Sequence, residues 1–312
     1  MRIEYHRTLL ADAPRNAAFK AALAALIKPG ISTVADIGAG TGVLGFMAAR
    51  LGAKRVYLYE SAAVLEVAER IRRLNRIDNV ELVPIHSTDV IDPPKVDIVV
   101  SETLGNYPYE ENIIQTMKDA RRRFLKRDGV ILPSRITQFV CPVLSPRYYR
   151  ELTVWDQLGL ELDFAPARMM SLNNAYVRRF LPADLLGEGR LAEAWDELDF
   201  ARAPATTRKG RAQWRITERA RIHGFALWWQ AELAASISLS TSPLAAPTHW
   251  EQLYLPVLQP LELGPGDVLG AELSSRSTID NGTTIAWCAL RSDRNGRTLN
   301  REDMDLEKGY LP

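Results

Sequence analysis

The segment Val34-Ala35-Asp36-Ile37-Gly38-Ala39-Gly40-Thr41-Gly42 decides the fold. It joins a short apolar run to three glycines in alternate positions, and residues 43–51 continue with helical spacing. A short apolar run in front of turn residues predicts a buried strand. Glycines let the chain turn sharply and let a ligand approach the backbone closely. The segment therefore predicts a strand, a ligand-binding turn and a helix.

The same alternation continues through the first half of the chain. Further strands are predicted at 55–60, 80–85, 96–101 and from 129 to 132, and helices at 62–76 and 111–125. The strands are largely apolar and β-branched, as in parallel sheets that helices cover on both faces. We therefore predict an α/β fold, with a Rossmann-like parallel-sheet domain over residues 1–134.

The second half of the chain contains more Thr, Ser, Trp and Pro. Segments with alternating apolar and polar residues, separated by turn signals, occur at 211–216, 222–233, 253–257, 268–273 and 283–290. They predict an antiparallel β-barrel or sandwich over residues 135–312. A more helical and apolar piece at 147–186 is predicted to pack against another surface, such as a second subunit.

The composition excludes several classes of protein. The chain has 312 residues and a net charge of +1, which argues against a surface built for nucleic acid. The basic stretch at 208–221 is best explained as the solvated face of a strand. Two distant cysteines and four histidines without metal-ligand spacing predict neither a disulfide scaffold nor a metal site. The apolar run at 21–27 is too short to cross a bilayer and no signal peptide precedes it, so we expect a cytoplasmic enzyme without a membrane partner.

The glycines and a carboxylate predict a nucleoside cofactor. Gly38, Gly40 and Gly42 follow the first strand, and Glu60 ends the second. An acid at the end of the second strand can accept hydrogen bonds from both hydroxyls of a ribose. The alternative is a plain glycine turn with a glutamate on the surface, but the position of the acid favours the cofactor.

The type of glycine turn favours S-adenosylmethionine over NAD. Dinucleotide-binding turns read GxGxxG and place a pyrophosphate at a helix N-terminus, whereas this turn reads GxGxG. Asp36 stands just before it, and a carboxylate suits an ammonium group better than a pyrophosphate. Ser87 and Thr88 follow the third strand, where an adenine ring would lie.

Two glutamates follow the fourth strand. Glu102 ends that strand, and a Gly-Asn-Tyr-Pro loop can return Glu111 to the same place. Ligands bind at the carboxyl ends of parallel strands, so both side chains are predicted to meet beside the cofactor. Two facing carboxylates repel one another, and a guanidinium, which is planar and permanently charged, removes that cost. Alternatively, Glu111 only begins the next helix, where acids favour the positive end of the dipole.

Four stretches resemble the protein arginine methyltransferases in their order and spacing, over nearly the whole chain. They are residues 34–44, Ser101-Glu102-Thr103-Leu104-Gly105 with Glu111 downstream, Thr248-His249-Trp250 after Ser240-Thr241-Ser242-Pro243, and Leu10-Ala11-Asp12-Ala13-Pro14-Arg15. The resemblance implies an S-adenosylmethionine-dependent enzyme that methylates the guanidinium of arginine, most simply in a protein. It also implies a β-barrel substrate domain and a helical dimerisation arm at about 148–185, hence a homodimer.

The resemblance assigns roles to the charged residues. Glu102 and Glu111 would hold the substrate guanidinium. Arg15 would bind the carboxylate of S-adenosylmethionine, and Glu60 would bind its ribose. The two glutamates would draw positive charge away from one guanidinium nitrogen, which would leave that nitrogen more nucleophilic.

The resemblance also places residues around the methyl acceptor. His249 would pair with Asp12 and accept a proton, although a histidine in a barrel can equally bond a backbone carbonyl. Leu9 and Ile113 fall where family members often have methionines that shape the pocket. Trp250 belongs either to this pocket or to the core of the barrel.

Three departures from the family pattern bear on the substrate. Few residues precede Asp12, which predicts that the aromatic helix covering the cofactor in the family is missing. Thr103 stands in place of a usual tryptophan, and Asn106 in place of a usual tyrosine. A more open site would accept free arginine or a small guanidine compound, which is the first alternative function. The second is an inactive scaffold that binds the cofactor and holds partners through its barrel.

Overall fold

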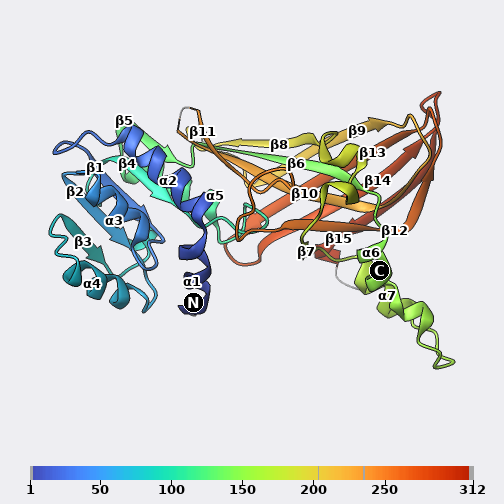
Figure 1. Cartoon of the computed structure of the whole chain (residues 1–312), viewed down its shortest axis with the longest axis horizontal. Helices are drawn as coiled ribbons and strands as arrows, with labels where there is room; N and C mark the ends of the chain where they lie inside the picture. The colour runs from blue at the N-terminus through green and yellow to red at the C-terminus, as the bar shows by residue number, and fades with distance from the viewer. Residues whose placement is uncertain (1–2, 203, 235, 309–312) are drawn as a thin grey trace.

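The computed structural model describes residues 3–202, 204–234 and 236–308. It has two lobes and a projecting arm (Figure 1). A parallel sheet with its helices forms the first lobe, and long antiparallel strands form the second. This arrangement confirms the predicted succession of a Rossmann-like sheet and an antiparallel sheet region.

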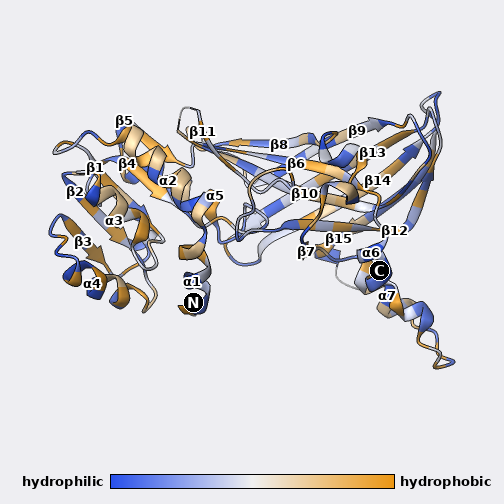
Figure 2. Ribbon diagram, in the orientation of Figure 1, coloured by the Kyte–Doolittle hydropathy of each residue, from blue (hydrophilic) through white to orange (hydrophobic). Residues whose placement is uncertain are grey.

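The first lobe is a five-stranded parallel sheet in the order β3-β2-β1-β4-β5. Its strands are β1 (Thr33–Ile37), β2 (Arg55–Tyr59), β3 (Val80–Val83), β4 (Val96–Ser101) and β5 (Leu125–Leu132). Hydrophobic residues concentrate on its central strands, β1 and β4 (Figure 2). Because Ile37 pairs with both Tyr59 and Ser101, the segments after β1, β2 and β4 leave the sheet at one edge.

The helices of this lobe differ from the prediction mainly at their ends. They are α1 (Ile3–Ala11), α2 (Ala13–Leu26), α3 (Val43–Arg50), α4 (Leu65–Leu74) and α5 (Ile113–Arg123). α5 ends before residue 125 because β5 already begins there and pairs with β4. Asp12 separates α1 from α2, where its carboxylate caps α2 by accepting the backbone N–H of Arg15.

The second lobe contains two antiparallel sheets. One has the order β7-β12-β10-β6-β8, with β11 also paired to β10, and the other has the order β15-β14-β13-β9. The strands are β6 (Arg135–Val143), β7 (Tyr176–Arg178), β8 (Glu193–Asp199), β9 (Thr207–Arg215), β10 (Ala220–Ala234), β11 (Ile237–Ser240), β12 (Gln252–Leu263), β13 (Val268–Thr278), β14 (Gly282–Ser292) and β15 (Thr298–Asp305). β8 and β9 contact each other across the two sheets, as do β12 and β14.

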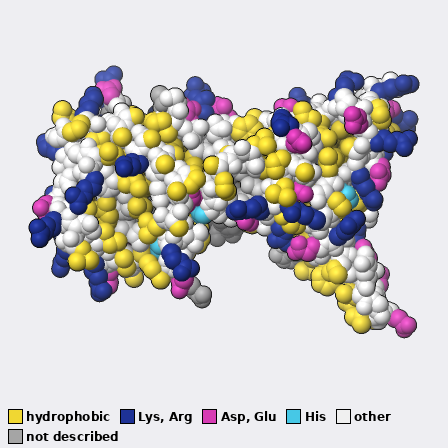
Figure 3. All heavy atoms as spheres, in the orientation of Figure 1, with side chains coloured by type: hydrophobic (Ala, Val, Ile, Leu, Met, Phe, Trp, Pro, Cys, Tyr) yellow, Lys and Arg dark blue, Asp and Glu magenta, His cyan; other side chains and the backbone are white. Residues whose placement is uncertain are grey.

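A helical arm leaves the second lobe between β6 and β7. It contains α6 (Arg147–Leu152), the 3-10 turn η2 (Val154–Gln157) and α7 (Ala165–Leu172), and it projects from the body of the molecule (Figure 1). Hydrophobic side chains gather along this projection (Figure 3). No helix in the described part of the chain combines the length and the apolar character that a membrane crossing requires.

Candidate active site

Gly38 and Gly40 of the glycine turn line a cleft at the sheet edge, whereas Gly42, also predicted to bind the cofactor, faces Phe46 and Leu58. Gly38, Gly40 and Gly42 all have positive φ angles, of 70°, 56° and 81°, which side chains disfavour. A Cβ atom on Gly40 would lie 2.9 Å from the ring of His6, and one on Gly38 would lie 2.8 Å from Thr103. Glycine is therefore needed here both for the backbone conformation and for the close approach of neighbours.

Glu60 lies at the end of β2, as predicted, and lines the cleft. Its Oε2 accepts the backbone N–H of Gly40 at 2.9 Å, and its Oε1 accepts that of Ala62 at 2.8 Å. Each carboxylate oxygen has a second lone pair. The backbone thus orients Glu60 while leaving it able to accept ribose hydroxyls.

Asp36 does not face the cleft. Its Oδ2 accepts the backbone N–H of Gly45 at 2.8 Å, and its side chain lies under the first turn of α3. Burial raises the pKa of Asp36 to about 7. The expectation that this carboxylate meets an ammonium group therefore does not fit its position, because the hydrogen bond to Gly45 turns it toward the helix.

The helix α1 contributes a residue that the sequence analysis missed. His6 is buried against Gly40 and lines the cleft with Leu9 and Leu10. The Nε2 atom of His6 is buried and has no hydrogen-bond partner among the described residues. The spacing of 6, 9 and 10 places three residues on one helix face, which is the signal that could have identified them. A helix, α1, therefore stands beside the cleft, although the aromatic helix that covers the cofactor in the family was expected to be missing.

The predicted adenine side is formed partly by other residues than expected. Ser87 lines the cleft, and its buried hydroxyl has no partner among the described residues. His86 lines it as well, whereas Thr88 turns outward and its hydroxyl lies 2.7 Å from Nδ1 of His86. Ser87 and Thr88 point in different directions because they are consecutive residues of the short 3-10 turn η1 (Ser87–Asp89), in which each residue is rotated by about a third of a turn from the last.

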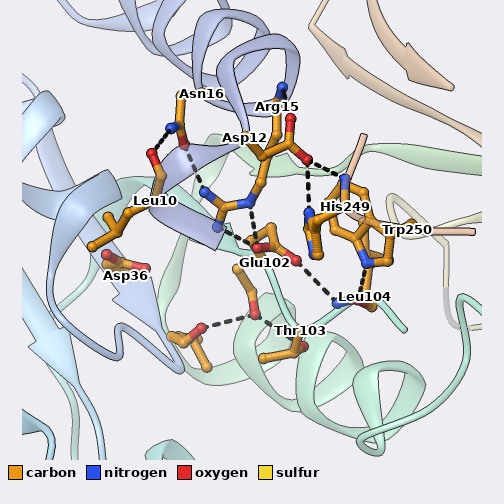
Figure 4. A network of polar contacts seen from close by, with 12 residues as sticks. Leu10, Asp12, Arg15, Asn16, Asp36, Glu102, Thr103, Leu104, His249 and Trp250 are labelled. Carbon is orange, nitrogen blue, oxygen red and sulfur yellow. Dashed lines mark hydrogen bonds and ion pairs between the residues drawn. The ribbon is translucent and has the colours of Figure 1, made fainter. Parts of the chain in front are cut away.

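Glu102 forms a buried ion pair with Arg15 (Figure 4). The Nε and Nη2 atoms of Arg15 both donate to Oε2 of Glu102, the first at 2.6 Å, and Nη1 donates to Asn16 at 2.8 Å. Oε1 of Glu102 accepts a longer bond of 3.4 Å from the backbone N–H of Leu104. Burial raises the pKa of Glu102, and Arg15 opposes that shift. One oxygen is therefore committed to Arg15, and the other can still accept strong hydrogen bonds.

Glu111 lines the same cleft as Glu102, as predicted. It lies outside α5, which begins at Ile113, so it is not simply a first-turn residue of that helix. Glu111 and Asn112 have φ angles of 55° and 57°, which are uncommon for such residues. Burial and the nearby Glu60 raise the pKa of Glu111. A cation between the two glutamates would relieve this unfavourable charge.

Asp12 and His249 form a pair beside Arg15 (Figure 4). Oδ2 of Asp12 accepts the backbone N–H of His249 at 2.8 Å and lies 2.7 Å from its Nδ1. Because a carboxylate accepts, Nδ1 carries the proton and Nε2 is left as an acceptor. Burial lowers the pKa of His249, and Asp12 opposes this shift. Nε2 is buried without a partner in the described chain.

Residues of the antiparallel lobe bond the loop between the two glutamates. Trp250 Nε1 donates to the backbone oxygen of Leu104 at 2.7 Å, and Trp229 Nε1 donates to that of Gly105 at 3.1 Å. The backbone N–H of Glu251 donates to Oδ1 of Asn106 at 2.8 Å. Trp250 is buried, with its ring against His249, so it packs in the core and supports the site from behind.

The structure thus brings together much of the predicted site. The cleft is lined by these predicted residues: Leu9, Arg15, Gly38, Gly40, Glu60, Ser87, Glu102 and Glu111. Asp12 and His249 adjoin it through Arg15. Ile113 is fully buried at the start of α5 instead of lining the cleft, because the turn at Glu111 directs it into the core.

Sequence comparisons relate the chain to known proteins. The profile of the arginine methyltransferase oligomerization subdomain matches residues 135–286, and that of the ribosomal protein L11 methyltransferases matches residues 20–150. Protein arginine N-methyltransferase 6 of Xenopus laevis is 31% identical over 270 residues, covering 81% of this chain and 78% of that protein. Protein arginine N-methyltransferase 2 of Xenopus tropicalis is 25% identical, covering 91% and 70%.

Solved structures show the same fold. The PRMT1 enzyme–prozyme heterotetrameric complex with AdoHcy from Trypanosoma brucei gives a TM-score of 0.85 at 21% identity, covering 98% of each chain. Protein arginine methyltransferase 10 of Arabidopsis thaliana gives 0.82 at 22% identity, again covering 98% of each. With this fold, and with extensive similarity to an arginine N-methyltransferase along most of both sequences, the chain belongs to the protein arginine methyltransferases, a family of S-adenosylmethionine-dependent enzymes.

Proposed function

We propose that this chain transfers a methyl group from S-adenosylmethionine to a guanidinium nitrogen of an arginine residue in a protein. The observation that carries the proposal is the shared cleft, where Glu102 and Glu111 lie beside the glycine turn and Glu60. Residues 1–134 would bind the cofactor, and residues 135–312 would complete the substrate site.

The cleft fits a nucleoside with a charged amino acid chain. Its wall leaves two buried polar atoms without partners in the described chain, Nε2 of His6 and the hydroxyl of Ser87. Such atoms are costly unless a ligand satisfies them. We assign Glu60 to the ribose, His86 and Ser87 to the adenine side, and Arg15 to the carboxylate of the cofactor. Bound S-adenosylmethionine supplies an electrophilic methyl group on its sulfonium.

The two glutamates suit a guanidinium by charge and by available oxygens. Oε1 of Glu102 and the carboxylate of Glu111 can each accept from a different edge of the planar cation. Charge-assisted bonds of this kind are stronger than neutral ones and fix orientation. They also draw positive charge toward the bound nitrogens, which leaves the third nitrogen more nucleophilic. Positioning and fixed charge then account for most of the rate.

The Asp12–His249 pair supplies a proton acceptor. Asp12 holds the proton on Nδ1, so Nε2 keeps its lone pair. Because the pKa of His249 is lowered by burial, the ring is neutral near pH 7 and can accept a proton. We propose that this ring takes up the proton that the methylated nitrogen releases.

The decisive experiment is mass spectrometry after incubation with S-adenosylmethionine. An arginine-rich protein and free arginine are offered separately, each at the same concentration of guanidinium groups. We expect mass increases of one methyl group or more on the protein. Methylation of free arginine alone would favour the small-molecule alternative. Binding of the cofactor without any methylated product would favour the scaffold.

We further propose that the arm joins two copies of the chain in a homodimer. Val154, Leu160 and Leu162 on the arm are exposed, the last two by 61% and 70%. A hollow on the first lobe, between α4 and β3, contains Leu65 and Leu82 among charged residues of both signs. The profile match to an oligomerization subdomain supports this assignment.

Sedimentation of an arm variant tests the dimer. Leu160→Asp combined with Leu162→Asp should convert the wild-type dimer into a monomer, because charges would be buried in the contact. Ile279→Asp, at a residue 73% exposed on the second lobe, is the matched control and should leave the dimer intact. A monomeric wild-type chain would contradict the proposal.

We also propose that the enzyme is located in the cytoplasm. Cys141 and Cys288 are buried and form no disulfide, which suits a reducing compartment.

A further inference from the structure

The loop that carries the two glutamates has a second attachment to the antiparallel lobe, besides the bonds from Trp229 and Trp250. Tyr109 stands two residues before Glu111 and is fully buried. Its hydroxyl donates to Oδ2 of Asp196 on β8 at 2.6 Å. The hydroxyl of Thr283, at the start of β14, donates to the backbone oxygen of Tyr109 at 2.7 Å. Both ends of this residue are therefore fixed by the antiparallel lobe.

Asp196 is itself held by a buried ion pair. Nε of Arg208 donates to Oδ1 of Asp196 at 2.9 Å, and Nη2 donates to the same atom and to the backbone oxygen of Glu197. The side chains of Arg208 and Asp196 are 18% and 4% exposed. Asp196 lies on β8 and Arg208 on β9, so the pair spans the two antiparallel sheets. Tyr109 is thus bound at the seam between them.

The position of Tyr109 bears directly on Glu111. One residue separates them, and the chain then passes through two positive φ angles at Glu111 and Asn112. Side chains adopt this backbone region at a cost, so surrounding contacts have to hold it. Before the turn the antiparallel lobe holds the chain at Tyr109, and after the turn the buried start of α5 at Ile113 fixes it.

We propose that Tyr109, held by the Asp196–Arg208 pair, is a positioning residue that sets where the Glu111 carboxylate stands in the substrate cleft. The inference rests on the proposed function, in which Glu111 binds the guanidinium. It makes the seam of the antiparallel lobe a support of the substrate site, although Tyr109, Asp196 and Arg208 do not line the cleft. Glu102 needs no such support, because it directly follows a central strand and is fixed by Arg15.

Tyr109→Phe tests the proposal with a close control. The variant removes one hydroxyl that donates to a buried carboxylate. Tyr254→Phe makes the same chemical change elsewhere, because Tyr254 is also fully buried and its hydroxyl donates to the backbone oxygen of His223 at 2.5 Å. Loss of a hydrogen bond to a charged group corresponds to about tenfold or more in an equilibrium. We expect Tyr109→Phe to lower kcat/KM for the arginine substrate about tenfold, mainly through KM, with the Kd of S-adenosylmethionine unchanged.

Hydrogen exchange of the backbone amides at 104–112 provides a readout that does not depend on turnover. Tyr109→Phe should speed exchange in this loop about tenfold, and Tyr254→Phe should leave it at the wild-type rate. Equal exchange in both variants, or a loss of kcat/KM no greater than that of Tyr254→Phe, would overturn the proposal. Failure of the wild-type chain to methylate any arginine would refute the proposed function instead, and loop exchange alone would then decide the positioning role.

Discussion

The two sides of the cleft are built in different ways. The glycine-turn wall of the cofactor side is local, because the turn, Glu60 and the first turn of α3 come from residues 36–62 and bond one another. The other residues assigned to the cofactor, Arg15, His86 and Ser87, reach the cleft from other segments. The substrate side is assembled from distant segments, with Arg15 bonded to Glu102, Asp12 to His249, and Tyr109 to Asp196. Cofactor binding should therefore tolerate changes that abolish methylation.

The largest expected effect is on the substrate side. Glu102→Gln removes a charge that faces both Arg15 and the proposed guanidinium. Leaving a buried cation half-paired costs about 3–5 kcal/mol, which corresponds to a loss of about 10²–10³-fold or more in kcat/KM. Turnover measured by mass spectrometry should nearly vanish, whereas calorimetry should still detect S-adenosylmethionine binding. Undiminished product would refute the role of Glu102.

His249→Gln should have the next largest effect, since a positioned base contributes about 10²-fold or more. In the wild type, kcat should fall as the pH drops below 6.5, because the pKa of His249 is lowered from that value and a protonated ring cannot accept a proton. The variant should lose the part of this acidic limb that His249 causes, whereas protonation of Glu102 and Glu111, whose pKa values burial raises, limits kcat in acid in both enzymes.

His223→Gln is the matched control for that pH profile. Burial also lowers the pKa of His223, but the residue lies on β10 within the antiparallel lobe. Its substitution should leave the acidic limb unchanged. If both variants keep the wild-type pH profile, the Asp12–His249 pair is not the proton acceptor.

A smaller effect is expected on the cofactor side from Gly40→Ala. The added Cβ would require a positive φ and would press on His6 at 2.9 Å. The turn relieves this strain by leaving its binding position, and restoring that position costs about 1–2 kcal/mol, so cofactor binding should weaken about tenfold, measured by calorimetry. Gly30→Ala carries the same strain, with φ at 72° and open space around it, so it should leave the Kd unchanged. Equal binding by both variants would show that the turn does not contact the cofactor.

The smallest effect concerns stability alone. The pKa of Asp36 is about 7 when folded and 3.8 in its ordinary range, so the folded chain holds this proton more tightly. Its contribution to stability is complete below pH 3.8 and is lost as the pH rises through 7. Relative to wild type, Asp36→Asn should gain about 1.4 kcal/mol in the free energy of unfolding between pH 6 and pH 8. Denaturant unfolding without cofactor measures this, and a pH-independent difference would contradict it.

The same contrast explains what the sequence could predict. The parallel strands, the glycine turn and Glu60 follow from local patterns, and the structure places them as expected. Strand order also predicts that Glu102 and Glu111 line one cleft. The carboxyl ends of the parallel strands share one edge, and the loop after β4 returns Glu111 to that edge. The turn of Asp36 toward Gly45 depends on one hydrogen bond, which apolar patterning cannot report.

Local sequence patterns cannot predict the contacts between distant segments of the chain. Helix α1 is short and carries polar and apolar residues without a clear pattern. The sequence alone therefore does not show that His6 packs on Gly40 and lines the cleft. Asp196 and Arg208 look like ordinary charged residues on strands, and only the meeting of two sheets makes them a buried pair. The same holds for Asn106, whose amide oxygen meets the backbone of Glu251.

The ion pair between Arg15 and Oε2 of Glu102 has a consequence for the design of inhibitors. Arg15 occupies Oε2, so an entering cation meets Oε1 on that side of the cleft. A compound that needs both oxygens of one carboxylate would have to displace the resident arginine. Amidines and alkylated guanidines that present a single N–H to each wall would avoid this cost, and head groups of that shape are the rational starting point for selective blockers.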